Sequence, residues 1–168
     1  MSRLMAEPLI MLDHAASPRE TSSTRALCAI AVMIAVSIGA ATVALPFRAL
    51  ALGAGPWLVG TIGGILMAAY AVGCMVLGPW VDHVRPRTAL LVGNVVWAIV
   101  LVAMGMTTRL SVLLVLALVY GAVMVAIWPP LMGWVSYGHE GPALNRRLGR
   151  YNMSWSGGMV IGPFLGGV

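Results

Sequence analysis

Long apolar runs separated by short charged segments dominate this sequence. Charged residues are absent from about 26–47, 57–78, 88–107, 111–136 and 151–168. A helix needs about 20 apolar residues to cross the hydrocarbon core of a membrane, and these runs lack the alternation of barrel strands. Backbone groups in lipid must also bond within their own segment. The pattern predicts an all-α, polytopic transmembrane helical bundle with four complete spans and a fifth that has begun.

The segment before the first run, residues 1–25, is more polar. It contains Pro8, Pro18 and a hydroxyl cluster over 21–24. A cleaved signal peptide would place an apolar core of about 7–15 residues closer to the start. We therefore interpret 1–25 as a flexible cytoplasmic tail and 26–168 as the transmembrane region, whose first span is an uncleaved anchor.

Composition changes the picture by excluding soluble classes. Hydrophobic residues make up 60% of the chain and charged residues 9%, and the mean hydropathy is +0.94. A soluble domain carries about 25% charged residues, so a soluble enzyme, a disordered tail and a nucleic-acid-binding domain are excluded. Cys28 and Cys74 lie inside apolar runs and are interpreted as buried thiols. The histidines lie far apart without a nearby ligand cluster, so we expect neither a metal nor a cofactor.

Arginine placement predicts the orientation of the chain in the membrane. The predicted outer loops hold only Arg48 and Arg109. The segments that would lie inside hold the others: Arg3, Arg19, Arg25, Arg85, Arg87, Arg146, Arg147 and Arg150. An excess of positive charge inside is typical of membrane proteins, and it explains the pI of about 10.0 without nucleic acid. We expect a cytoplasmic N-terminus in a cell inner membrane, and the lack of lysine hints at a bacterial source.

A first motif lies between the second and third runs, in the segment 78–87. Gly78 ends the second run, Asp82 follows four residues later, and Arg85 and Arg87 precede the third run. A carboxylate at a helix–loop junction is able to interact with the positive end of a neighbouring helix dipole and pair with nearby arginines. The alternative is a solvated charged loop that obeys the positive-inside rule.

A second motif lies in the fifth run. It consists of Gly149, Gly158, Gly162, Pro163, Gly166 and Gly167. Gly158, Gly162 and Gly166 recur every four residues, so they share one helix face that allows another backbone to approach closely. Pro163 removes a helix hydrogen bond and favours a kink. Such a face suits a moving interface between two halves of a protein; ordinary helix packing is the alternative.

These two motifs carry a resemblance to the major facilitator superfamily. The first resembles its loop signature G-x-x-x-D-R-x-G-R-R, with His83, Arg85 and Pro86 departing from it. The second resembles the antiporter motif G-x8-G-x3-G-P-x2-G-G of its drug-efflux members. The resemblance covers roughly 26–168. It implies the first roughly 4.5 helices of a twelve-helix fold that works by alternating access.

The resemblance also implies where substrate would bind. In this fold the first and fourth spans line the central cavity, and the polar and aromatic residues on them are Ser37, Thr42, Tyr120 and Trp128. Packing and bonds to backbone carbonyls are the alternative for the two hydroxyls. Pro129-Pro130 in the fourth span predicts a kink or break. No ionisable residue lies near the middle of a span, so no proton-coupling group is visible.

The resemblance suggests a further gate residue. An acid after the fourth span often joins the arginines of the first loop in family members, so we hypothesise that Glu140 pairs with Arg85 or Arg87. The alternative is a pair of surface charges in a polar loop, which would contribute about 0–1 kcal/mol.

The function expected from these observations is transport, not enzymatic catalysis. We expect a secondary active or facilitative transporter that exports small apolar compounds, with metabolite or sugar uptake as the alternative. The last run ends at Val168 without a polar cap. We therefore expect an N-terminal fragment whose partners are the lipid bilayer, a small-molecule substrate and the missing C-terminal part of its own chain. A truncated membrane protein that does not transport, acting as a partner or remnant, is the remaining alternative.

Overall fold

The computed structural model describes residues 18–81 and 83–167, with side chains from residue 24 onward. Residues 1–17, Asp82 and Val168 lie outside these described residues. The described part is helical and contains no strand, which confirms the predicted all-α class. The helices are α2 (Pro18–Ala51), α3 (Pro56–Val81), α4 (Pro86–Met106), α5 (Leu110–Met124), α6 (Trp128–Ser136) and α7 (Gly141–Gly166).

Four stretches of the described chain are long and apolar enough to cross a membrane. They are Thr24–Ala51, Pro56–Val81, Pro86–Met106 and Leu110–Ser136, and they correspond to the first four predicted spans. α7 is not among them: its first half carries arginines at 146, 147 and 150, and its second half is rich in glycine and serine, which are weakly hydrophobic. The predicted span 151–168 falls on its apolar second half and stays a prediction.

The first helix is longer than the predicted first span. α2 begins at Pro18 and ends at Ala51, so residues 18–25 of the predicted tail are helical. Proline is tolerated at the first position of a helix because its missing N–H would have no partner there. The helix also continues through Pro46 at its other end.

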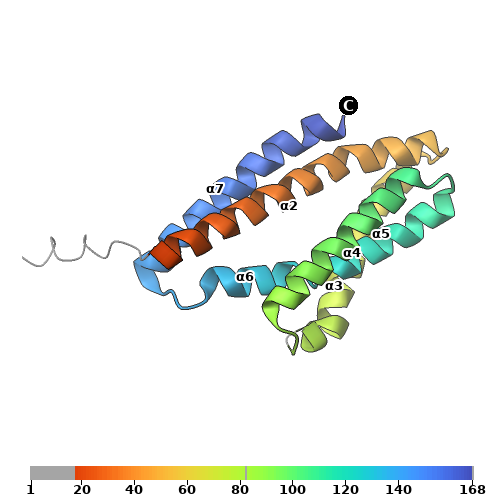
Figure 1. The fold of residues 1–168 in the computed structure, drawn as a ribbon. Coiled ribbons are helices and arrows are strands. Elements are labelled where there is room, and N and C mark those ends of the chain that lie inside the picture. The colour runs from red at the N-terminus through yellow and green to blue at the C-terminus, as the bar shows by residue number, and fades with distance from the viewer. Residues whose placement is uncertain (1–17, 82, 168) are drawn as a thin grey trace, which may run out of the picture.

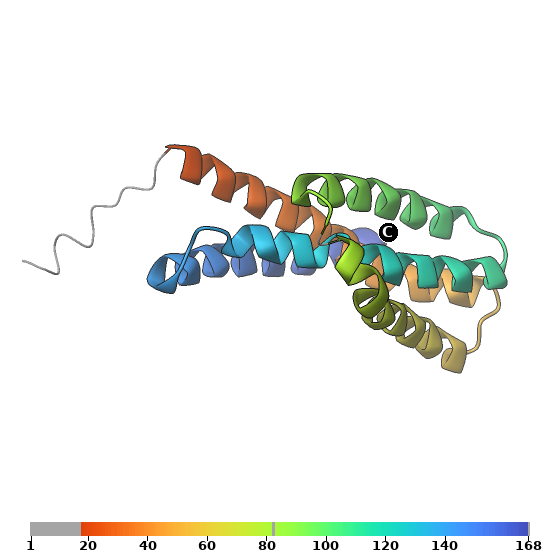
Figure 2. The ribbon, with the colours of Figure 1, turned by 90° about the horizontal axis from the view of Figure 1, so that it is seen from below.

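Consecutive spans run in opposite directions, and α2 and α7 run parallel to each other (Figure 1). α2, α4 and α7 begin, and α3 and α6 end, toward one end of the molecule, which we call the N-terminal end of the bundle. α5 lies between α3 and α4 (Figure 2). Gly53, with φ of +86°, forms the turn between α2 and α3 at the opposite end, a left-handed conformation that favours glycine.

The surface of the bundle is strongly apolar. Large hydrophobic side chains are exposed along several helices, among them Trp57, Met75, Trp80 and Phe164. The core is made of residues such as Ala31, Leu113 and Leu131, which are fully buried. Exposed apolar surface on this scale marks contact with lipid or other protein, in agreement with the spans identified from length and composition.

Candidate functional site

The glycine face of α7 lies directly against α2. A Cβ placed on Gly158 would lie 2.6 Å from Ala35 Cβ and 2.8 Å from Val32 O. A Cβ on Gly162 would lie 2.7 Å from Gly39 Cα. These separations are shorter than real carbon contacts, so only glycine fits at these positions. The two backbones therefore touch along the face that the spacing of four residues predicts.

Proline and glycine meet at the centre of this interface. A Cβ on Gly39 of α2 would lie 2.9 Å from Pro163 Cδ. One helical turn further along, a Cβ on Gly166 would overlap the Ala40 carbonyl oxygen. Gly149 is exposed with open space around it, and Gly167 lies beyond the end of α7. The central part of the motif thus contacts α2 closely, a Cβ on Gly167 would lie 4.0 Å from Val43 Cγ1 of α2, and Gly149 does not reach α2.

α2 of the same bundle covers the glycine face in the described residues, as ordinary helix packing would. A role of this face at a moving interface between two halves stays a prediction. α7 also continues as a helix through Pro163. The physical reason for the close contact is the small side chains that α2 presents opposite the motif, at Ala35, Gly39 and Ala40, which match its glycines in size.

The fourth span is broken, as Pro129-Pro130 predicted. α5 ends at Met124 and α6 begins at Trp128. The N–H groups of 125, 126 and 127 each bond the carbonyl three residues earlier, at 3.0–3.2 Å. Two consecutive prolines remove two helix hydrogen bonds, so the chain tightens into short-range turns before α6.

Glycines on the two neighbouring helices accommodate this break. A Cβ on Gly73 of α3 would lie 2.9 Å from Val125 Cγ2, and one on Gly93 of α4 would lie 3.1 Å from Ala126 Cβ. Gly121 of α5 meets α3 even more closely, at the Leu66 carbonyl. The broken span is therefore held between α3 and α4 by close backbone contacts.

The structure brings two of the predicted cavity residues together. Thr42 and Tyr120 line one small pocket of about 220 Å³ between α2, α3 and α5. Its other walls are apolar, from residues such as Ile62, Leu66 and Met124. The Tyr120 ring is buried and packs against Trp97, with ring centroids 5.6 Å apart.

The other two predicted cavity residues lie elsewhere. The Trp128 ring packs on Trp155 of α7, with centroids 4.7 Å apart, and it does not line the pocket that Thr42 and Tyr120 share. Ser37 donates its hydroxyl proton to Met33 O at 2.8 Å, and Thr42 donates to Gly39 O at 2.7 Å. Both hydroxyls therefore satisfy their own helix, the alternative weighed from the sequence.

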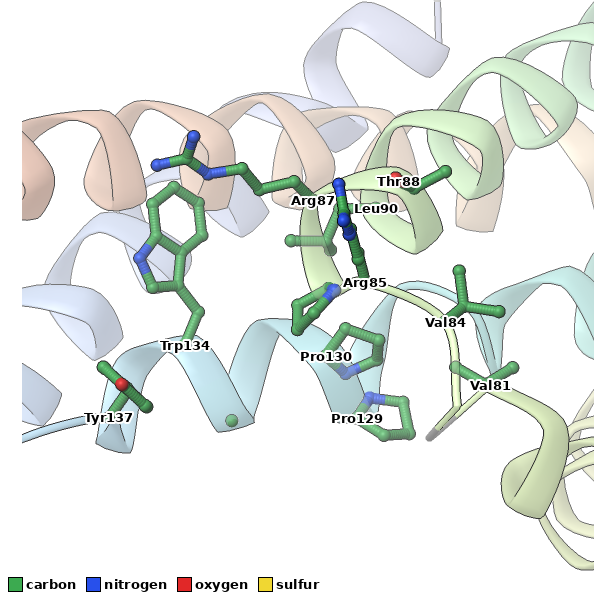
Figure 3. Close-up of a pocket in the computed structure, with 12 residues that line it drawn as sticks. Val81, Val84, Arg85, Arg87, Thr88, Leu90, Pro129, Pro130, Trp134 and Tyr137 are labelled. Atoms are coloured by element: carbon green, nitrogen blue, oxygen red, sulfur yellow. The ribbon is translucent and has the colours of Figure 1, made fainter.

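The arginines of the first motif line a pocket at the N-terminal end of the bundle. The pocket measures about 620 Å³ and lies between the start of α4 and α6. Figure 3 shows Arg87 extending toward Trp134 of α6, whereas the Arg85 side chain points away from Pro130. Gly78 has open space around it. Asp82, the acid of the motif, lies outside the described residues, so its partners are not described.

Glu140 makes no ion pair with the arginines of this pocket among the described residues. It is exposed at the start of α7, and its side chain makes no cap hydrogen bond there. The hypothesised clamp between Glu140 and Arg85 or Arg87 is therefore not formed in this structure. The charges are complementary, but neither side chain is held in place by burial.

Two arginines that sequence reasoning treated only as loop charges make specific contacts. Arg147 is 8% exposed, and its guanidinium lies 3.1 Å from His139 Nδ1 and donates to Trp134 O at 3.4 Å. Arg48, at the opposite end, donates to Thr107 O at 2.6 Å and so joins α2 to the end of α4. Their position next to span ends was the only signal in the sequence.

The described residues offer no place for a metal. Within 18–81 and 83–167, no group of three His, Cys, Asp or Glu side chains is arranged to hold an ion.

Comparison with protein families identifies the class. A bundle of antiparallel apolar spans, one of them broken at a proline pair, is typical of membrane transport proteins. The family model of the Major Facilitator Superfamily matches residues 27–168. The chain belongs to this superfamily and is a multi-pass membrane protein of the transporter class. No curated protein and no solved structure matches the chain.

Proposed function

We propose that this chain serves the export of small apolar compounds across the cytoplasmic membrane of a bacterium. It would work by alternating access, as a secondary active or facilitative transporter. The N-terminal end of the bundle would face the cytoplasm, because every arginine of the sequence except Arg48 and Arg109 lies in a segment that we predict to be inside. Uptake of a sugar or other metabolite is the competing direction.

The observation that carries the proposal is the pocket between α2, α3 and α5. Its lining is apolar except for Thr42 and Tyr120, and the Thr42 hydroxyl already bonds Gly39 O. A sugar needs several unpaired hydrogen-bond partners, whereas an apolar compound needs only shape and dispersion contacts. The volume of about 220 Å³ is below the roughly 300–1,000 Å³ typical of drug-sized ligands, which favours small cargo.

The direction of transport rests on the glycine motif of α7. Its pattern resembles that of drug-efflux members, and its central glycines form a backbone contact with α2, the helix that also lines the pocket. The motif is thus one helix away from the proposed cargo. This proximity supports a role in shaping the pocket during export.

The proposal is tested by filling the pocket. Gly63 lines it, and a Cβ there would meet open space. Gly64 is equally open but does not line the pocket. Gly63→Leu is expected to reduce export of the apolar dye N-phenyl-1-naphthylamine by about tenfold or more, because a leucine side chain occupies much of so small a volume. Gly64→Leu is the matched control and should leave export unchanged.

The measurement uses the chain in inside-out and right-side-out vesicles, with the dye and labelled glucose as separate probes. Export of apolar compounds is supported if the dye moves away from the cytoplasmic face and if Gly63→Leu, but not Gly64→Leu, reduces this movement. Glucose entry with no dye movement would favour the uptake alternative. If neither the dye nor glucose moves, the result contradicts transport of these two types of substrate by this chain.

A further inference from the structure

A second pocket lies at the N-terminal end of the bundle, between α2 and α7. It measures about 560 Å³ and is lined by Thr24, Arg25, Cys28, Arg150, Met153 and Ser154. It is separate from the pocket between α4 and α6, since the two share no lining residue. Two cations, two hydroxyl side chains and apolar walls therefore meet at the point where α2 and α7 run side by side.

Arg25 of α2 and Arg150 of α7 differ from the two other described arginines of α7 in their hydrogen bonds. Arg146 donates to Pro142 O, and Arg147 donates to Trp134 O. Arg25 and Arg150 are exposed and make no hydrogen bond or ion pair among the described residues. The described lining also contains no carboxylate. Two guanidinium groups from different helices thus line one pocket, and no described side chain supplies a counter-charge there.

An apolar stripe continues from the pocket along α7. Met153 lines the pocket and is 78% exposed. Gly157, Val160 and Phe164 follow at helical spacing and are also exposed. Positions separated by three or four residues share one helix face, so positive charge lies at one end of an apolar face that runs toward the membrane centre.

We infer that this pocket binds the phosphate headgroup of an anionic phospholipid of the cytoplasmic leaflet, with one acyl chain along the stripe of α7. Guanidinium groups bind phosphate oxygens through paired hydrogen bonds. Basic pockets between transmembrane helices on the cytoplasmic side are suited to such headgroups. A free phosphate would satisfy the arginines but not the apolar stripe, so the stripe favours the lipid. The inference rests on the proposed orientation and not on transport.

Cys28 gives a direct readout, because it lines the pocket. Cys74, on α3, is the only other cysteine of the sequence. In a Cys74→Ala chain, the rate of Cys28 alkylation by N-ethylmaleimide is measured in vesicles of phosphatidylcholine, with or without phosphatidylglycerol. Phosphatidylglycerol is expected to slow alkylation by about tenfold or more, because the bound lipid covers the thiol. A Cys28→Ala chain reports Cys74, whose alkylation should not change.

The arginine variants decide whether the pocket is responsible. Arg25→Gln with Arg150→Gln should abolish the protection of Cys28. Arg109→Gln with Arg146→Gln removes the same charge outside the pocket and should preserve it. Circular dichroism establishes that each variant keeps its helices. Protection that survives loss of Arg25 and Arg150, or that fails equally in the control pair, overturns the inference.

A final experiment distinguishes a lipid headgroup from a free anion as the ligand of the pocket. Inorganic phosphate is added to phosphatidylcholine vesicles that hold the same Cys74→Ala chain. Little protection of Cys28 is expected, because phosphate brings no acyl chain to the stripe. Protection by phosphate equal to that by phosphatidylglycerol would contradict lipid binding and assign the pocket to a soluble anion.

Discussion

The interface of α2 with α7 and the interface of α4 with α6 differ in how closely the helices approach. Along α2 and α7, no Cβ fits at Gly158, Gly162 or Gly166. Between the start of α4 and α6 there is instead a pocket of about 620 Å³ lined by arginine, proline and aromatic side chains. Both regions are contacts within one bundle, so residue size and shape account for the difference.

The comparison indicates which parts of the bundle are able to move relative to each other. Close-packed helices change arrangement only in discrete steps, because any small shift produces overlap. α2 and α7 are therefore expected to move as one body, because the contacts at Gly158, Gly162 and Gly166 join them beyond the pocket at their N-terminal ends. The start of α4 and α6 has a pocket and no such glycine contact in the described residues, so rearrangement there has a lower cost. A transporter that alternates its access needs both a rigid part and a part that opens.

The largest expected effect comes from breaking the tight interface. Gly158→Ala places a Cβ 2.6 Å from Ala35 Cβ, so the helices must separate. Overpacking of this kind costs about 1–3 kcal/mol. The free energy of unfolding, measured in mixed detergent micelles with increasing dodecyl sulfate, should fall by that amount.

Two glycines serve as controls for this prediction. Gly157 is the neighbour of Gly158, but a Cβ added to it would meet open space. The same holds for Gly133 of α6, which lines the pocket of about 620 Å³ between α4 and α6. Alanine at either position should be neutral or stabilise by up to about 1 kcal/mol, because alanine favours helix more than glycine does. Equal losses at 157 and 158 would show that the interface is not the cause.

How far the sequence predicted these features depends on whether the signal is local. Apolar run length and the Pro129-Pro130 pair are local, and both the spans and the break were predicted from them. The spacing of Gly158 and Gly162 predicted a shared face, but not that α2 would cover it, because pairing between distant segments leaves no mark in spacing. The same holds for Arg48, whose partner Thr107 lies 59 positions away.

A smaller effect is expected at the opposite end of the bundle, where Arg48 joins α2 to α4. The hydrogen bond from its guanidinium to Thr107 O measures 2.6 Å. Bonds to charged groups contribute about 1.5–3 kcal/mol, and partial exposure of Arg48 lowers this, so Arg48→Gln should cost about 1 kcal/mol of unfolding free energy. Arg109→Gln is the control, since the Arg109 side chain makes no hydrogen bond in the described structure, where the Thr107 hydroxyl bonds the backbone of Arg109. The prediction is contradicted if the two variants lose the same stability.

The smallest effect is expected between Glu140 and Arg87, at the pocket between the start of α4 and α6, which we call the loose region. Both side chains are exposed and no ion pair joins them in the described residues. A double-mutant cycle with Glu140→Gln and Arg87→Gln should give a coupling below about 0.2 kcal/mol, the lower limit of exposed pairs. A coupling of about 1 kcal/mol would show that the clamp forms in solution.

The double-mutant cycle reports only on the resting conformation, so transport measurements are needed to detect a clamp that forms in another conformation. If the clamp forms only in another conformation of the transporter, Glu140→Lys will reduce transport although the coupling in the resting chain is near zero. Such a result would place the conformational change in the loose region, where free volume and unpaired charge permit it. Intact transport in Glu140→Lys would remove the clamp hypothesis and leave the shape of the pocket, rather than its charge, to account for any opening between α4 and α6.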